Sequence, residues 1–167
     1  MSGKLVKWAL IFGAVSTGSV VMAATSAGTL TATAAVLGSC TIGSATLAFG
    51  VYDPASTVNN DTQTTVSVLC TSGTNYSIYS TTPIASRFMT TGAGTAGMVL
   101  AYGVQGSAAN RLANIQLPLT HTTGSITGTG TGTPQAVDLF GRVAALQNVV
   151  AGAYTNSAAT ANLTIDY

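Results

Sequence analysis

The chain has 167 residues and a formal net charge of +1 at pH 7, and only 5% of its residues are charged. So small and balanced a charge gives no electrostatic attraction to nucleic acid or to an anionic membrane surface, and excludes both as charge-driven partners. The length suits a single domain with enough residues to bury a hydrophobic core.

The first 23 residues predict a secretory signal peptide. Lys4 and Lys7 give a positive start, and a mostly apolar run of 15 residues follows from Trp8 to Met22. We place cleavage after Ala23, with Ala24 or Ala27 as alternatives. The run is shorter than the roughly 20 apolar residues that a transmembrane helix needs, so a membrane anchor is the less favoured interpretation.

Residues 24–167 would then form the exported protein, with three arginines, four aspartates and no lysine or glutamate. Threonine, serine, alanine and glycine take the places where a cytosolic protein carries charged side chains. This composition is typical of an extracellular, wall-like protein.

Residues 24–38 form an extension that precedes the first cysteine. It contains a period-2 alternation, with one apolar face opposite a face of Thr29, Thr31 and Thr33. The apolar face consists of Leu30, Ala32, Ala34 and Val36. A strand of this kind needs a partner, and we expect it to donate its apolar face to a different molecule.

Cys40 and Cys70 are the only two cysteines. An exported chain passes through an oxidising compartment, so a disulfide is the expected state. The two positions are equidistant from Ala55, which lies in a turn-forming run at 53–56, so they can face each other across a hairpin. A metal site that uses both cysteines and the distant His121 is disfavoured, because structural zinc takes four closely spaced ligands.

Short strands separated by turns follow along the rest of the chain, which predicts an all-β sandwich. No segment with helical periodicity exceeds about two turns. The expected strands are Cys40–Gly50 with a bulge near Gly43, Thr62–Cys70, Thr74–Ser80, Met98–Val104, Leu117–His121, Val137–Val143 and Ala158–Tyr167. Two further expectations are a flexible loop over Gly124–Pro134 and a tyrosine corner at Tyr154.

The inventory of reactive side chains argues against catalysis. His121 is the only histidine, and it lies in a polar run. Without glutamate, paired-carboxylate chemistry would need aspartates that fall in turns or on polar strand faces. We therefore expect no enzyme activity, no catalytic or metal-binding residues, no cofactor and no small-molecule substrate.

Several short motifs in order resemble one protein family. They are LAFGVYDP at 47–54, TSGTNY after the second cysteine at 71–76, LAYGV at 100–104, LFGRV at 139–143 and GAYTN at 152–156. Together with the cysteines and the alternating C-terminal strand, they resemble the spore coat protein U domain, over residues 39–167. That family includes the pilins of archaic chaperone-usher pili. The chain departs from the family pattern at Asn156, where an aspartate is usual.

The resemblance implies an immunoglobulin-like sandwich that lacks its seventh strand and is completed by donor-strand complementation. The donor strand would be the apolar face of the extension. The acceptor groove would be lined by Leu47, Phe49, Ala161, Leu163, Ile165 and Tyr167.

The resemblance also implies partners and a location. A periplasmic chaperone would bind first, an outer-membrane usher would follow, and further copies of the chain would join head to tail in fimbriae on the cell surface. The expected function is that of a structural pilin that supports adhesion and biofilm formation. The alternatives are a spore or cell-surface coat protein of the same family, or a monomeric secreted carbohydrate-binding sandwich.

Overall fold

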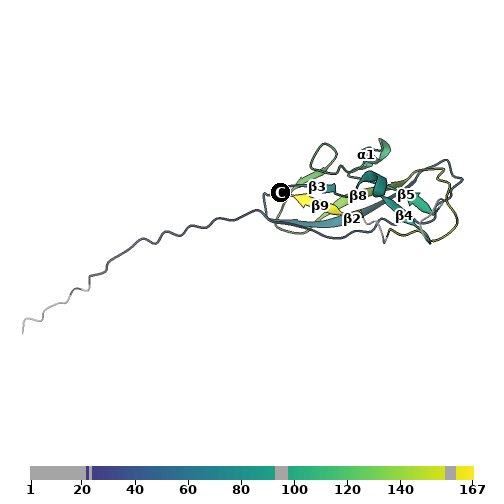
Figure 1. Ribbon diagram of the computed structural model, residues 1–167. Coiled ribbons are helices and arrows are strands. Elements are labelled where there is room, and N and C mark those ends of the chain that lie inside the picture. The colour runs from purple at the N-terminus through teal and green to yellow at the C-terminus, as the bar shows by residue number, and fades with distance from the viewer. Residues whose placement is uncertain (1–21, 23, 93–97, 157–160) are drawn as a thin grey trace, which may run out of the picture. The chain divides into compact units, whose positions relative to one another are not determined.

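The computed structural model describes residues 22, 24–92, 98–156 and 161–167 (Figure 1). The chain divides into two units, Met1–Ala35 and Val36–Tyr167. In the first unit, the described residues from 24 onward are exposed and form no helix or strand. The strand predicted over Leu30–Val36 is therefore not formed within a single chain. The signal peptide prediction falls almost entirely outside the described residues.

The second unit is built from antiparallel sheets, which confirms the predicted all-β fold (Figure 1). One sheet has four strands in the order β1 (Cys40–Ile42), β2 (Asn60–Cys70), β8 (Gln135–Val143) and β6 (Gly103–Gln105). A second has the order β7 (Ile126–Thr129), β3 (Asn75–Ser80) and β9 (Leu163–Asp166). A separate ribbon pairs β4 (Phe88–Thr90) with β5 (Val99–Ala101). The described helices are the short 3₁₀ turn Ile84–Ser86 and α1 (Ala108–Leu112).

The core lies between the two larger sheets. In β2 the apolar residues Val66, Val68 and Cys70 alternate with exposed residues, so one face of the strand is buried and the other meets solvent. Ile78 in β3 packs in the same cluster from the opposite sheet and is fully buried. Each such side chain contributes about 1.5–3 kcal/mol of transfer free energy on burial. This shared core makes the two sheets a sandwich.

The predicted disulfide is present. Cys40 and Cys70 stand opposite each other in the β1–β2 ladder and are bonded, with their Cα atoms 4.1 Å apart. The bond closes a loop between residues 30 apart in sequence. It therefore fixes the start of the compact unit to the end of its longest strand.

The first strand is shorter than predicted. We expected it to run from Cys40 to Gly50, but its ladder with β2 ends at Ile42, and the last backbone bond joins the Gly43 N–H to the Ser67 carbonyl at 2.8 Å. Beyond Gly43 the chain stays beside β2 through hydrogen bonds from β2 side chains to its backbone. The Thr62 hydroxyl donates to the Ala48 carbonyl at 2.8 Å. At the position where we predicted a bulge, near Gly43, the chain therefore leaves the sheet.

The structure corrects other strand predictions. The predicted strand Met98–Val104 divides into β5 and β6, which belong to different sheets, and Tyr102 stands between them. Leu117–His121 forms no strand; the Leu117 N–H donates to the Val104 carbonyl and the Pro118 carbonyl accepts from the Ser80 N–H, without a continuous ladder. Gly124–Pro134 is not simply a loop, since it contains β7. The last strand begins at Leu163; residues 157–160 lie outside the described part.

A charged cluster lies on the outer side of the four-stranded sheet. Asp61 accepts hydrogen bonds from Arg142 at 2.7 and 2.8 Å and lies 3.3 Å from the Nε atom of Arg111. The hydrogen bond from Arg142 is the main reason that the pKa of Asp61 is lowered. This cluster joins β2, β8 and α1 away from the core.

Replacing both cysteines with alanine should lower the free energy of unfolding by about 3–4 kcal/mol, because the disulfide restricts the unfolded chain. Urea unfolding followed by circular dichroism measures the change. A reductant should reproduce the loss in the original protein and have no effect on the double variant. Two reactive thiols in the denatured, unreduced original protein would contradict the disulfide.

Candidate functional site

The three-stranded sheet ends in an unpaired edge. β9 pairs with β3 on one side, and no described strand pairs with its other side. In the other sheet, β1 is likewise an edge strand, and it lies close to β9. An exposed edge carries a row of unpaired N–H and carbonyl groups that can template another strand. The sandwich is therefore open between β1 and β9.

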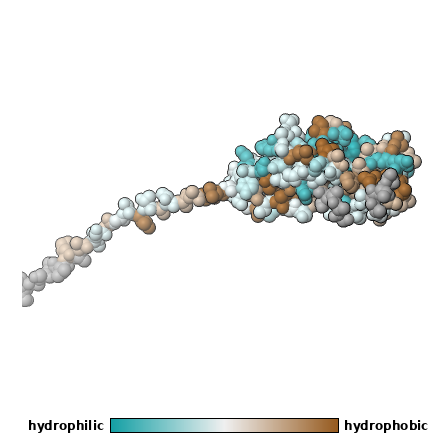
Figure 2. All heavy atoms as spheres, in the orientation of Figure 1, coloured by the Kyte–Doolittle hydropathy of each residue, from teal (hydrophilic) through white to brown (hydrophobic). Residues whose placement is uncertain are grey.

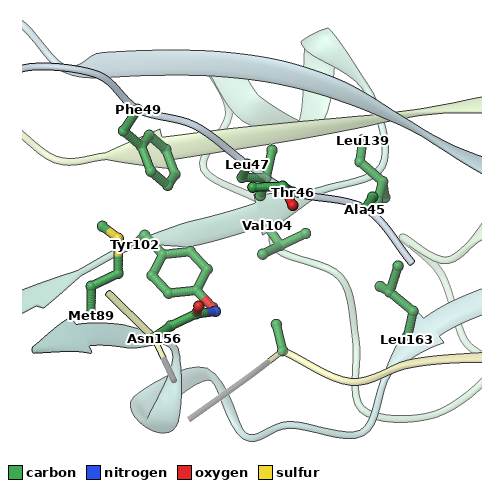
Figure 3. A pocket seen from close by; sticks show the side chains of 11 residues that line it. Ala45, Thr46, Leu47, Phe49, Met89, Tyr102, Val104, Leu139, Asn156 and Leu163 are labelled. Atoms are coloured by element: carbon green, nitrogen blue, oxygen red, sulfur yellow. The ribbon is translucent and has the colours of Figure 1, made fainter. Parts of the chain in front are cut away.

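A cavity of about 220 Å³ lies along this opening (Figure 3). Residues 45–49 form one wall, and Ala161 and Leu163 form the opposite wall. Val104 from β6 and Leu139 from β8, both buried, also line it, from the four-stranded sheet. The cavity thus reaches the core that the two sheets share.

A second cavity, of about 770 Å³, adjoins the first. It lies between residues 47–54 and residues 149–154, and it shares Leu47, Phe49 and Met89 with the first cavity. We call the two adjoining cavities the groove. None of the described residues that line them is charged.

Gly141 in β8 shapes one wall of the groove. A Cβ atom at this position would lie 2.9 Å from Cζ of Phe49 and 3.1 Å from both Cδ atoms of Leu47. Because Gly141 carries no side chain, Leu47 and Phe49 can lie this close to the backbone of β8. The wall formed by residues 45–49 therefore depends on the missing side chain at Gly141.

A buried arginine holds the loops beside the groove. Arg87 is 1% exposed and donates to the carbonyl oxygens of Thr82 and Leu117 and to the Gln116 side chain, at 2.9–3.2 Å. Burial lowers the pKa of this guanidinium group. The backbone carbonyl of Arg87 accepts a hydrogen bond from the Tyr102 N–H at 3.0 Å. Arg87 thereby anchors the chain just before Met89, which lines both cavities.

The structure brings four of the six predicted groove residues together. Leu47, Phe49, Ala161 and Leu163 all line the first cavity. Ile165 instead packs against the core opposite Ile78, and Tyr167 is 63% exposed; neither lines the groove.

The predicted donor residues all lie in the exposed extension. Leu30 is 96% exposed and Val36 is 83% exposed, and Ala32 and Ala34 are exposed as well. Figure 2 shows hydrophobic residues interrupting an otherwise pale extension. Both the groove and the extension therefore present apolar surface without a partner within the described single chain.

Sequence reasoning missed several lining residues: Met89, Tyr102, Val104, Leu139 and Asn156. For three of them the alternation within the predicted strands 98–104 and 137–143 was a usable signal, because it placed them on an apolar face. Met89 and Asn156 carry no such signal. Tyr154 lines the second cavity, and its hydroxyl donates to the Val150 carbonyl at 2.8 Å, the contact predicted for a tyrosine corner.

The groove is suited to binding an extended segment. Its lining is mainly aliphatic and aromatic and offers an extended segment two things: apolar contacts and the free backbone edge of β9. Across the described ranges, no group of three histidine, cysteine, aspartate or glutamate side chains is placed to hold a metal ion. No helix among those same residues has the length and apolar character to cross a membrane.

Comparison with known proteins identifies a family for this chain. The family model of the Spore Coat Protein U domain matches residues 26–160, which includes most of the extension and most of the sandwich. No curated protein matches the chain.

Substituting Gly141 with alanine should lower the free energy of unfolding by about 1 kcal/mol or more, because the new methyl group displaces Leu47 and Phe49. Gly43→Ala is the matched control, since the nearest atom to its Cβ would be the Ser67 carbonyl oxygen at an ordinary 3.4 Å. Chemical unfolding of both variants measures the difference. Equal stability of the two variants would show that the wall does not depend on Gly141.

Proposed function

The chain belongs to the Spore Coat Protein U domain family, and on this premise we propose that it is a structural pilin of a chaperone-usher surface fibre. Family membership supports a structural protein of the cell surface. The finer proposal is that subunits polymerise by donor-strand exchange and that the fibre serves adhesion and biofilm formation, without enzyme activity. The observation that carries it is the uncharged groove beside the free edge of β9.

An inserted strand would relieve two liabilities of the monomer at once. It would pair with the free edge of β9, and it would cover the apolar walls of the groove. The extension supplies a suitable strand, because Leu30, Ala32, Ala34 and Val36 form one apolar face. Two of these are alanines, so the backbone ladder must contribute much of the binding free energy.

The direction of the strands favours insertion into a second copy. The extension enters the compact unit at Cys40, which pairs with Cys70 at the end of β2, and β3 begins a few residues later. Asp166, at the end of β9, pairs with Ser77 near the start of β3, so β9 runs toward the side of the sandwich where the extension enters. An extension folded back into its own groove would therefore run parallel to β9.

An extension from another copy has no such restriction and can run antiparallel to β9. Antiparallel pairing is slightly more stable per residue than parallel pairing. The donor and acceptor surfaces are different, so this contact is head-to-tail and propagates a filament instead of closing a dimer.

The remaining partners follow from the exposed groove. A free apolar groove is an aggregation hazard during export, so a periplasmic chaperone that lends a strand would have to protect it, and an outer-membrane usher would direct the exchange. The predicted signal peptide supports this route. A coat protein of the same family is the second candidate, which the name of the matched family favours; it would use the same contact between copies.

Ala34→Asp should abolish fibres, because the inserted strand would bury an unpaired charge in the apolar groove at a cost of several kcal/mol. Thr33→Asp is the matched control on the opposite face and should still give fibres. Negative-stain microscopy of cells and the ladder of unboiled oligomers on gels measure both. Ordinary fibres from Ala34→Asp cells would show that the extension is not the donor strand.

Deleting Leu163–Tyr167 should abolish periplasmic accumulation of the chain, because it removes β9 and with it both the partner of β3 and the edge that a chaperone would pair. Immunoblots of periplasmic extracts measure the level. The single substitution Tyr167→Ala, at an exposed position outside the groove, should leave the level unchanged. Normal soluble levels of the truncated chain would contradict the role of β9.

A further inference from the structure

A hydrogen-bonded polar pair lies among the mainly apolar residues that line the first cavity. The Asn156 side-chain amide donates to the Tyr102 hydroxyl at 3.1 Å, and both residues line the cavity (Figure 3). Tyr102 is 6% exposed, and its ring lies 5.9 Å from that of Phe49, between centroids. We call the hydrogen-bonded pair of Asn156 and Tyr102 the polar step.

Backbone hydrogen bonds hold both members of the polar step in place. The N–H of Tyr102 donates to the Arg87 carbonyl, and Arg87 is itself buried and bonded to neighbouring loops. Next to Asn156, Thr155 exchanges two backbone bonds with Thr90 of β4, at 2.8 and 3.0 Å. The pair therefore joins two separately anchored segments and cannot move aside without breaking its own hydrogen bond.

We propose that the polar step determines which strand the groove accepts: it admits a small side chain of the inserted strand and rejects a large aliphatic one. The occupant is the extension of a second copy of this chain, with Ala32 and Ala34 meeting the step. This inference rests on the proposed function and adds a specificity-determining element to it.

The sequence of the extension fits this requirement. Its apolar face has large residues at its ends, Leu30 and Val36, and small ones in the middle, Ala32 and Ala34. The two cavities adjoin at Phe49 and Met89, which line both, and the polar step lies beside these two side chains (Figure 3). A methyl group fits beside the polar step, whereas a leucine there would separate the amide from the hydroxyl and leave buried polar groups unpaired. The second N–H and the carbonyl oxygen of the same amide can bond the backbone of the inserted strand.

A peptide-binding experiment on the full exported chain, residues 24–167, tests the proposal. A fluorescent peptide with the sequence of residues 24–38 is compared, by anisotropy, with the same peptide carrying Ala32→Leu or Ala34→Leu. We expect the original peptide to bind at least about tenfold more tightly than one or both of the substituted peptides, the factor that one unpaired buried polar group costs. In the Asn156→Ala protein, which removes the amide and opens space, the preference should fall to within about threefold.

Gln63→Ala is the control protein, because Gln63 is an exposed amide on the outer face of β2, and it should keep the full preference. Circular dichroism before each titration confirms that every variant is folded. Binding of the original peptide with an unchanged preference in Asn156→Ala would overturn the polar step and leave the groove's proposed role intact. No binding of any peptide to the folded original protein would overturn both the proposed function and this inference.

Discussion

β9 hydrogen-bonds to β3 along one edge, and along the other edge no described strand meets it. The missing neighbour leaves the apolar side chains between the two sheets uncovered on one side, so the core of the sandwich opens directly into the groove. Soluble proteins avoid both a free strand edge and a large uncovered apolar surface. A strand from outside the compact unit removes both together, and the rest of the proposed function follows from this requirement.

The elements around the groove are fixed before any strand enters. The disulfide ties Cys40 to the end of β2, and Gly141 lets Leu47 and Phe49 lie against β8. On the other side, Arg87 binds three loop groups from a buried position. The groove is therefore largely preorganised, and the main entropic cost of binding is the ordering of the incoming strand. The extension, by contrast, has no regular structure of its own in its described residues.

Much of this architecture was predictable from local patterns. The period-2 alternation located β2, β3 and β8, and the symmetric placement of the cysteines about a turn predicted the β1–β2 pairing. Of the residues expected in the acceptor groove from this strand, Leu163 lines the first cavity, whereas Ile165 packs against the core and Tyr167 is exposed.

The features that sequence reasoning missed depend on contacts between distant segments. After the chain leaves the β1–β2 ladder at Gly43, side-chain hydrogen bonds from Thr62 and Asn60 hold it beside β2. No local sequence pattern reveals these hydrogen bonds. The change of sheet at Tyr102 depends on the carbonyl of Arg87. β7 forms in a glycine- and threonine-rich run because β3 offers it a partner edge, a tertiary effect that overrides weak local propensity.

The central claim, that the extension of one copy fills the groove of another, is tested most directly by amide hydrogen exchange. Monomeric and oligomeric fractions of one preparation are separated by size and followed over Leu30–Val36 by mass spectrometry. The account predicts that these amides exchange freely in the monomer and become strongly protected in the oligomer, together with β9. Oligomers with an unprotected extension, or a monomer whose extension is already protected, would contradict it.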